Sequence, residues 1–260
     1  MKGARAIWSG NVSFGLINFP VKLQSAAQDD NLDFDLLSKG DLAPIHYARI
    51  DSKTGEEIAY KDIVKGYQYA KGKYIVVTDE DFEKARPHLA KSIDIIQFVK
   101  EEEIDPLYYE KPYYIVPSKG AEKSYKLLVK ALDETKTVGI AEFMLRNRAH
   151  LCALKSYEGV LLLNQLRYAE EIRSLPDAKT ASARITPKEI QLATKLIHQL
   201  TETFNPAAFK DTYVAELKKV IRAKAEGKNI HIAEPRKIPS DVRDLMEVLK
   251  ESLSKGKKRA

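Results

Sequence analysis

The residues best suited to bind phosphate form the short segment Arg146-Asn147-Arg148. This segment follows an apolar run over residues 138–145 that is typical of a strand, so we expect it at a strand end or turn. On an extended chain, residues two apart project to the same side, and a guanidinium can bind a phosphate through two hydrogen bonds. We therefore predict that Arg146 and Arg148 contact phosphate. A solvated turn with salt bridges at its rim is the alternative that the local sequence leaves open.

Arg49 and Lys53 are a second basic pair, placed around the turn signal Ser52-Lys53-Thr54-Gly55. Serine, threonine and glycine favour a turn because they bond to nearby backbone or adopt positive φ. We predict that this turn presents its cations to an anionic partner. The alternative is again a solvated turn.

A cluster of tyrosines interleaved with lysine offers a different chemistry. Aromatic rings beside cations can stack bases in proteins that bind single strands. The competing interpretation is that alternate tyrosines pack into a barrel wall while their neighbours face outward. The cluster consists of Tyr108, Tyr109, Tyr113 and Tyr114 around Lys111, followed by Lys119 and Lys123.

No pattern in the chain predicts catalysis. Gly10 and Gly15 have the spacing of a P-loop, but Leu16-Ile17 replace the lysine and hydroxyl residue that bind phosphate and Mg²⁺. The five histidines show no metal-ligand spacing, and the single cysteine, Cys152, allows neither an internal disulfide nor a cysteine zinc cluster. We expect no enzyme, cofactor or metal, and an enzyme with an unrecognised site is the least favoured reading.

The composition is that of a globular protein, with 44% hydrophobic and 31% charged residues in a chain of 260. No apolar run approaches the roughly 18 residues of a membrane helix, and the start lacks the apolar stretch of a signal peptide. We therefore expect a cytoplasmic protein without membrane association. The net charge of +6 fits nucleic-acid binding. Residues 236–260 hold eight Lys/Arg against four Asp/Glu, so a binding site in the body needs segregated charge.

The elements that would position these residues are mainly strands up to Pro176. Trp8, Val12 and Phe14 alternate with polar residues, which predicts a half-buried first strand in which Gly10 permits a bend or close approach. Pro20 is expected to introduce the second strand. Lys71-Gly72 predicts a hairpin. Further strands are expected at 93–99, 113–116, 138–145, 151–156 and 160–166, with helices after Thr78 and over 121–134, the latter burying Leu127, Leu128, Ala131 and Leu132.

Helices are predicted after Pro176. Thr186-Pro187-Lys188-Glu189 has the features of a helix start, and Asn205-Pro206 is expected to open a second helix that ends near Gly227. We divide the chain into residues 1–176, 177–227 and 228–260. Ser240 is expected to cap a last amphipathic helix, which either docks on the protein or captures a partner. Its apolar stripe consists of Val242, Leu245, Met246, Leu249 and Leu253.

An ordered series of segments between Arg5 and about Lys250 resembles the bacterial Ku proteins, the family that binds DNA ends in non-homologous end joining. Any one segment would be a weak signal, whereas the series covers nearly the whole chain. The segments are RAIWSGNVSFGLINFPVKL (5–23), GEEI (55–58), DIVKGY (62–67), YIVVTDED (74–81), EEIDPLYY (102–109), PYY (112–114), FMLRNR (143–148) and GVLLL (159–163).

The resemblance implies an α+β fold, mainly β: a Ku-like β-barrel with extended arms that form a dimeric ring, followed by a helical C-terminal region. It implies a homodimer that encircles double-stranded DNA ends without reading bases, and recruitment of the ATP-dependent DNA ligase D. A barrel-type module for single-stranded nucleic acid is the alternative. By motif position, the implied DNA-binding residues are Arg5, Arg49, Lys53, Lys111, Arg146 and Arg148, and the stripe from Val242 to Leu253 is the implied partner-binding face.

Two departures from the family pattern are visible. Some relatives carry a CxxC before the Gly-Glu-Glu segment, but here Asp51 and Thr54 hold those places, so no zinc site is expected. Others end in a long lysine-rich extension, of which only Lys255, Lys257, Lys258 and Arg259 remain here. We therefore expect the tail to contribute little to DNA binding.

Overall fold

The structure is a computed structural model. It describes residues 5–28, 32–85, 91–146, 148–176, 184–228, 248–249 and 252–254. The chain divides into two compact units, one made of residues 1–29 and 33–174 and the other of residues 30–32 and 175–260.

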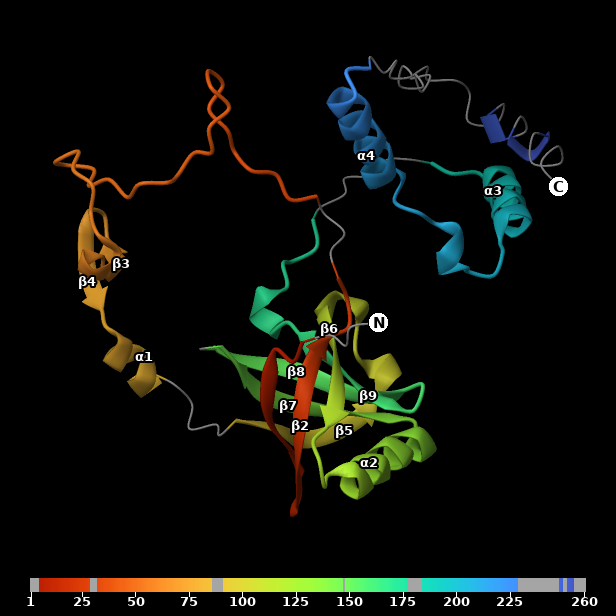
Figure 1. The fold of residues 1–260 in the computed structure, drawn as a ribbon. Coiled ribbons are helices and arrows are strands. Elements are labelled where there is room, and N and C mark those ends of the chain that lie inside the picture. Colours follow the sequence, from red (N-terminus) through yellow and green to blue (C-terminus); the bar gives the residue numbers. More distant parts are fainter. Residues whose placement is uncertain are drawn as a thin grey trace. The chain divides into compact units, whose positions relative to one another are not determined.

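A closed seven-stranded barrel forms the core of the first unit (Figure 1). Neighbouring strands are antiparallel except for β1 and β5, which pair in parallel and close the barrel. Closure leaves no open sheet edge in the barrel. In barrel order the strands are β1 (Trp8–Phe14), β2 (Ile17–Ser25), β6 (Tyr109–Pro117), β9 (Val160–Leu166), β8 (Arg148–Tyr157), β7 (Thr137–Leu145) and β5 (Ser92–Lys100).

The predicted alternation of the N-terminal strand is confirmed, because Val12 is fully buried while Ser9 is exposed. The expected start of the second strand was wrong: β2 begins at Ile17, and Pro20 lies within it, opposite Asn11. Proline has no N–H to donate. Its carbonyl still accepts from the Ser118 N–H at 2.9 Å, so the chain remains extended through this position.

Gly10 allows the close approach that the sequence predicted. A Cβ built on Gly10 would lie 2.1 Å from the carbonyl oxygen of Lys91 and 2.3 Å from the ring of Trp8. The next residue, Asn11, donates its N–H to the same Lys91 carbonyl at 2.9 Å. Glycine at this position therefore lets β1 reach the segment that leads into β5.

Helix α2 (Glu122–Thr135) packs against the barrel through Tyr125, Leu128, Val129 and Leu132. The expectation that Leu127 and Ala131 belong to this buried face was wrong, since Leu127 is 55% exposed and Ala131 is also exposed. Tyr125 and Val129 are buried instead. Burying a large apolar side chain contributes about 1.5–3 kcal/mol, so these residues and the barrel interior dominate the stability of the unit. Phe143, Leu154 and Leu163 are among the fully buried residues.

Residues 32–85 contain a two-stranded sheet, one 3-10 turn (Tyr60–Asp62) and one short α-helix. Strands β3 (Lys65–Ala70) and β4 (Lys73–Val77) form the predicted hairpin, with Gly72 at φ 75° in its turn. Helix α1 (Asp79–Ala85) follows Thr78 as predicted, and Asp81 accepts from the N–H and hydroxyl of Thr78 at its start. Large apolar side chains in this segment are exposed, among them Phe34, Tyr47, Tyr60, Val64 and Tyr67.

The second unit is helical. Helix α3 (Pro187–Leu200) starts at Thr186 with the predicted capping box to Glu189. The expected helix start at Asn205 was wrong: Pro206–Ala208 is a single 3-10 turn, and α4 (Thr212–Ala225) begins after Asp211, whose carboxylate accepts from the N–H groups of Tyr213 and Val214.

In the predicted last helix, Leu249 and Leu253 are helical and half-buried. Val242, Leu245 and Met246 lie outside the described residues. Across the part of the chain that the structure describes, no helix has both the length and the apolar character needed to cross a membrane.

Candidate nucleic-acid interface

Arg146 lies in the tight connection between β7 and β8. Leu145 pairs directly with Arg148, and Arg146 has a φ of 60°. Positive φ is a feature of the turns that suit two-residue hairpins. The prediction of a strand end or turn is thus confirmed. The assumption that both arginines project from an extended chain was wrong, because Arg146 occupies the turn itself and Arg148 starts the next strand.

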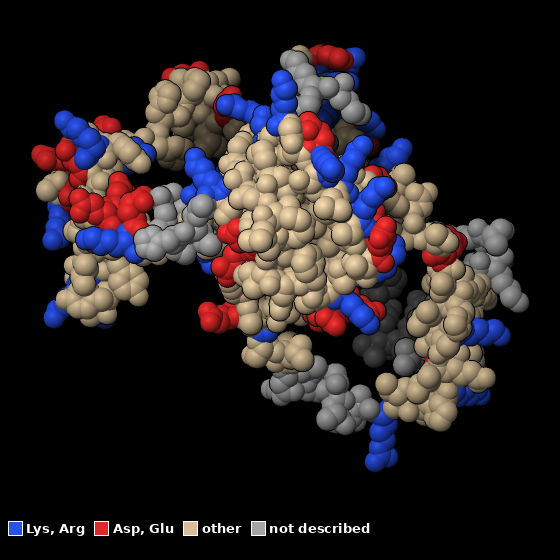
Figure 2. Space-filling view, turned by 90° about the horizontal axis from the view of Figure 1, so that it is seen from below, with Lys and Arg blue, Asp and Glu red and all other residues tan. Residues whose placement is uncertain are grey.

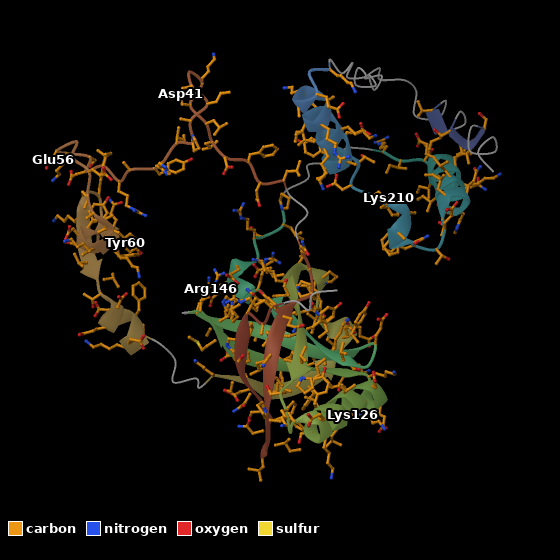
Figure 3. The ribbon with its side chains drawn as sticks, viewed as in Figure 1. Asp41, Glu56, Tyr60, Lys126, Arg146 and Lys210 are labelled. Carbon is orange, nitrogen blue, oxygen red and sulfur yellow. The ribbon has the colours of Figure 1, made fainter. Side chains whose placement is uncertain are left out.

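The β7–β8 turn borders a hollow of about 790 Å³ on the barrel unit. Four of the six predicted DNA-binding residues line it, and they come from separate places in the chain: Arg5 before β1, Lys111 on β6, and Arg146 and Arg148 at the turn. Figure 3 shows Arg146 at the end of the barrel away from Lys126 on α2. The fold therefore gathers cations that are up to 143 positions apart in sequence into one concave surface, which we call the basic hollow.

Arg49 and Lys53 do not line the basic hollow. The Arg49 guanidinium stacks on the ring of Tyr60, 5.0 Å from its centroid. Lys53 lies in the predicted turn, where Asp51 accepts from the N–H groups of Lys53 and Thr54 at 2.7 and 3.3 Å. These bonds lower the pKa of Asp51. Asp51 thus closes the turn that carries Lys53.

A carboxylate engages one of the arginines in the basic hollow. The Arg148 Nη2 donates to the Glu171 Oε1 at 3.1 Å. The other oxygen, Oε2, accepts from the backbone N–H of Tyr168 at 2.8 Å. The Tyr168 N–H and then Arg148 lower the pKa of Glu171, so this carboxylate stays ionised at neutral pH.

A second carboxylate, that of Glu110, belongs to a row of polar side chains that crosses β6, β9 and β8. The amide of Gln165 donates to Glu110 Oε2 at 2.8 Å and lies 3.0 Å from His150 Nδ1. Burial, followed by the nearby Arg148 charge, lowers the pKa of His150. Its ring also packs against Phe143, with 5.8 Å between centroids. His150 is therefore neutral at pH 7, and the basic hollow has four cations against two carboxylates.

The tyrosine cluster follows the barrel-wall interpretation. Tyr113 is buried at 7% exposure and Tyr114 is 37% exposed, as the alternation along β6 requires. Burial raises the pKa of Tyr113 and of Tyr109. A ring as enclosed as that of Tyr113 presents no face on which a base can stack. The cluster therefore gives little support to single-strand binding.

Charge on one face of the protein is mixed. Figure 2 shows acidic and basic side chains interspersed around a broad face without charged groups. Because Lys and Arg exceed Asp and Glu only modestly over the whole sequence, 43 against 37, the local gathering of cations in the basic hollow is the feature that suits a polyanion. Within the described residues there is no group of three or more His, Cys, Asp or Glu side chains that could hold a metal ion.

Sequence reasoning missed five polar residues of the basic hollow: Glu110, His150, Gln165, Tyr168 and Glu171. His150 could have been found, because it lies two residues after Arg148 on the same strand and so on the same face. Glu171 gave no such signal. It lies 23 positions after Arg148 and reaches it only because the chain turns back after β9.

Comparison with known families gives one match over most of the chain. The family model described as Ku, the Ku70/Ku80 beta-barrel domain, matches residues 13–192. That range includes six of the seven barrel strands in full and the last two residues of β1, together with the segment from 32 to 85.

Three similar proteins, each named non-homologous end joining protein Ku, align over nearly the full chain. The protein from Archaeoglobus fulgidus is 41% identical over 252 residues, which is 96% of this chain and 98% of the relative. The protein from Opitutus terrae is 38% identical over 257 residues, covering 96% and 91%. The protein from Bacillus subtilis is 36% identical over 261 residues, covering 97% and 82%.

Proposed function

The chain belongs to the Ku family of non-homologous end joining proteins, and on that premise we propose that it binds the ends of double-stranded DNA independently of sequence. Membership makes it a non-catalytic protein of DNA double-strand break repair. The basic hollow is the observation that supports the DNA site. Phosphate contacts position a protein on the duplex and carry no base information, which suits a protein that accepts any broken end.

Within the basic hollow, Arg5, Lys111, Arg146 and Arg148 would contact the phosphates. The flexible side chains of Arg146 and Arg148 project from a rigid hairpin whose strands are held by the barrel ladder. A guanidinium bonds to phosphate through two N–H groups, so each arginine can bind two oxygens of one DNA phosphate. Arg49 and Lys53 would form a second set of contacts, because both side chains are exposed.

The protein would act as a homodimer that closes a ring around DNA. Residues 32–85 support this proposal, because Tyr47, Tyr60 and Tyr67 are 83%, 77% and 68% exposed in this segment. Exposed apolar groups on this scale are typical of surfaces that a second chain covers. The two-stranded sheet of β3 and β4 pairs with no other described strand, which also suits an arm completed by a partner.

The C-terminal helix would recruit a DNA ligase of the ligase D type. The stripe of Val242, Leu245, Met246, Leu249 and Leu253 has the spacing of an apolar face that fits a groove on a partner. Leu249 and Leu253 are helical and half-buried, which is compatible with this helix. We place the ligase contact on this stripe.

Competition between linear and circular DNA tests the proposed function. Linear duplex should bind, whereas a relaxed closed circle of the same sequence should not compete, because a closed ring admits DNA only at an end. Equal competition by the circle at matched mass would overturn the ring. Preference for single-stranded over duplex ends would favour the alternative, a barrel-type module for single-stranded nucleic acid.

A further inference from the structure

We propose that Glu171 limits the affinity of the basic hollow for DNA by competing with phosphate for the Arg148 guanidinium. This inference rests on the proposed function and assigns to Glu171 a role in setting the affinity for DNA. It starts from the ion pair between Arg148 Nη2 and Glu171 Oε1 at 3.1 Å. The two side chains are 66% and 41% exposed, so a phosphate in the basic hollow can reach the guanidinium that Glu171 already engages.

Glu171 is fixed in place independently of Arg148. Its Oε2 accepts from the backbone N–H of Tyr168, the N-cap residue of the 3-10 turn Ala169–Glu171, at 2.8 Å. The carboxylate therefore stays at the rim of the basic hollow when Arg148 moves to a phosphate. When Arg148 binds a phosphate, this carboxylate loses its cationic partner, so the ion pair opposes the contact between Arg148 and DNA.

The competition has a signature in the salt dependence. A phosphate that gains a cationic contact releases condensed counterions, which makes the slope of log K against log salt more negative by roughly 0.9 for each contact. When Arg148 leaves Glu171, the exposed carboxylate takes up a cation from solution. Part of the counterion release is thereby cancelled, so the contact made by Arg148 adds less than a full unit to the slope.

Glu171→Gln is the variant that isolates this effect. A glutamine keeps an oxygen that can accept from the Tyr168 N–H but carries no charge. At low salt the variant should bind linear duplex about twofold to fivefold more tightly, the range expected for an exposed ion pair. Its salt slope should be steeper than that of the wild type by up to about 0.9, and the two affinities should converge as salt rises.

Glu170→Gln is the matched control, because Glu170 lies next to Glu171 in the same turn, is exposed and does not line the basic hollow. It should leave affinity and slope unchanged. In an Arg148→Gln background, Glu171→Gln should not increase the affinity for DNA, because Glu171 then has no guanidinium to withhold from phosphate. Urea unfolding of each variant checks that the fold is retained.

Three results would overturn the inference while leaving the proposed function intact. Glu171→Gln could bind DNA no better than the wild type, it could bind more weakly because Glu171 orients Arg148, or it could gain equally in the Arg148→Gln background, which would indicate a general charge effect. Failure of the wild type to bind linear duplex would instead overturn the proposed function, and this inference with it.

Discussion

The side chain of Tyr125 joins helix α2 to two barrel strands, because its hydroxyl bonds to the backbone of Leu161 on β9 and of Ile115 on β6. The Leu161 N–H donates to the Tyr125 hydroxyl at 2.7 Å, and the hydroxyl donates to the Ile115 carbonyl at 2.8 Å. Both bonds are buried, and Tyr125 is 6% exposed. One hydroxyl therefore satisfies a donor on β9 and an acceptor on β6 that would otherwise be buried without partners.

Tyr125→Phe should lower the free energy of unfolding by about 1–3 kcal/mol, because it leaves the Leu161 N–H and the Ile115 carbonyl unsatisfied. Urea denaturation followed by circular dichroism measures the change. Tyr114→Phe is the matched control on the exposed side of β6 and should change the midpoint little. Equal midpoints for the wild type and Tyr125→Phe would show that water replaces the lost hydroxyl.

Gly10→Ala should destabilise the barrel by more than about 2 kcal/mol, since the added methyl would meet the Lys91 backbone at 2.1 Å. The parallel β1–β5 pair would have to separate locally. Gly40→Ala provides the comparison, because a Cβ at Gly40 meets nothing within 4 Å and should be tolerated. Thermal unfolding measures the difference, and Gly10→Ala should have the lower melting temperature. Similar melting temperatures of the two variants would contradict the close approach at Gly10.

Changing Arg146 and Arg148 together to Gln should weaken binding to all duplex sequences alike. The slope of log K against log salt should become shallower by about 0.9 to 1.8, the loss of one to two phosphate contacts. Fluorescence anisotropy over a salt series measures it. Lys126→Gln with Lys130→Gln removes the same charge from the exposed face of α2, at the other end of the barrel (Figure 3), and should leave the slope nearly unchanged. Equal effects of the two double variants would place the DNA site elsewhere.

The stability of the protein should fall as the pH drops below about 6.5, the ordinary pKa of histidine. Burial and Arg148 lower the pKa of His150 in the folded state, so the unfolded chain takes up a proton first and the folded state loses relative stability. His150→Gln should flatten this dependence between pH 7.5 and 5.5 in urea denaturation. His46→Gln changes an exposed histidine and should retain the wild-type slope. An unaltered slope in His150→Gln would assign the dependence to other groups.

Truncation after Pro239 should abolish stimulation of a cognate ligase D while leaving the dimer and most end binding intact. The truncation removes the apolar stripe of the last helix together with the basic tail. A full-length variant with Lys255, Lys257, Lys258 and Arg259 changed to Gln keeps the stripe and should still stimulate ligation. Ligation assays and sedimentation measure the two properties. A truncated protein that becomes monomeric, or that stimulates fully, would make the helix structural and move the ligase contact elsewhere.

Local pattern was enough to predict much of the barrel. The strands over 93–99, 138–145, 151–156 and 160–166 lie within or match β5, β7, β8 and β9, because alternation and apolar runs depend on neighbouring residues alone. The helix starts at Thr78 and Thr186 were equally local, since each capping residue bonds three positions ahead. Leu127 and the start of β2 were misjudged because packing, not propensity, decides which face is buried and where a ladder begins.

The sequence by itself determined the family, the strand-rich fold and the cations available for phosphate. Only the tertiary structure decided which of those cations meet: Arg5, Lys111, Arg146 and Arg148 line one hollow, whereas Arg49 and Lys53 do not. The tertiary structure also brought Glu171 into an ion pair with Arg148. The reason is physical: closure of the barrel sets the distances between residues far apart in the chain, and a single sequence without its fold carries no signal for such pairs.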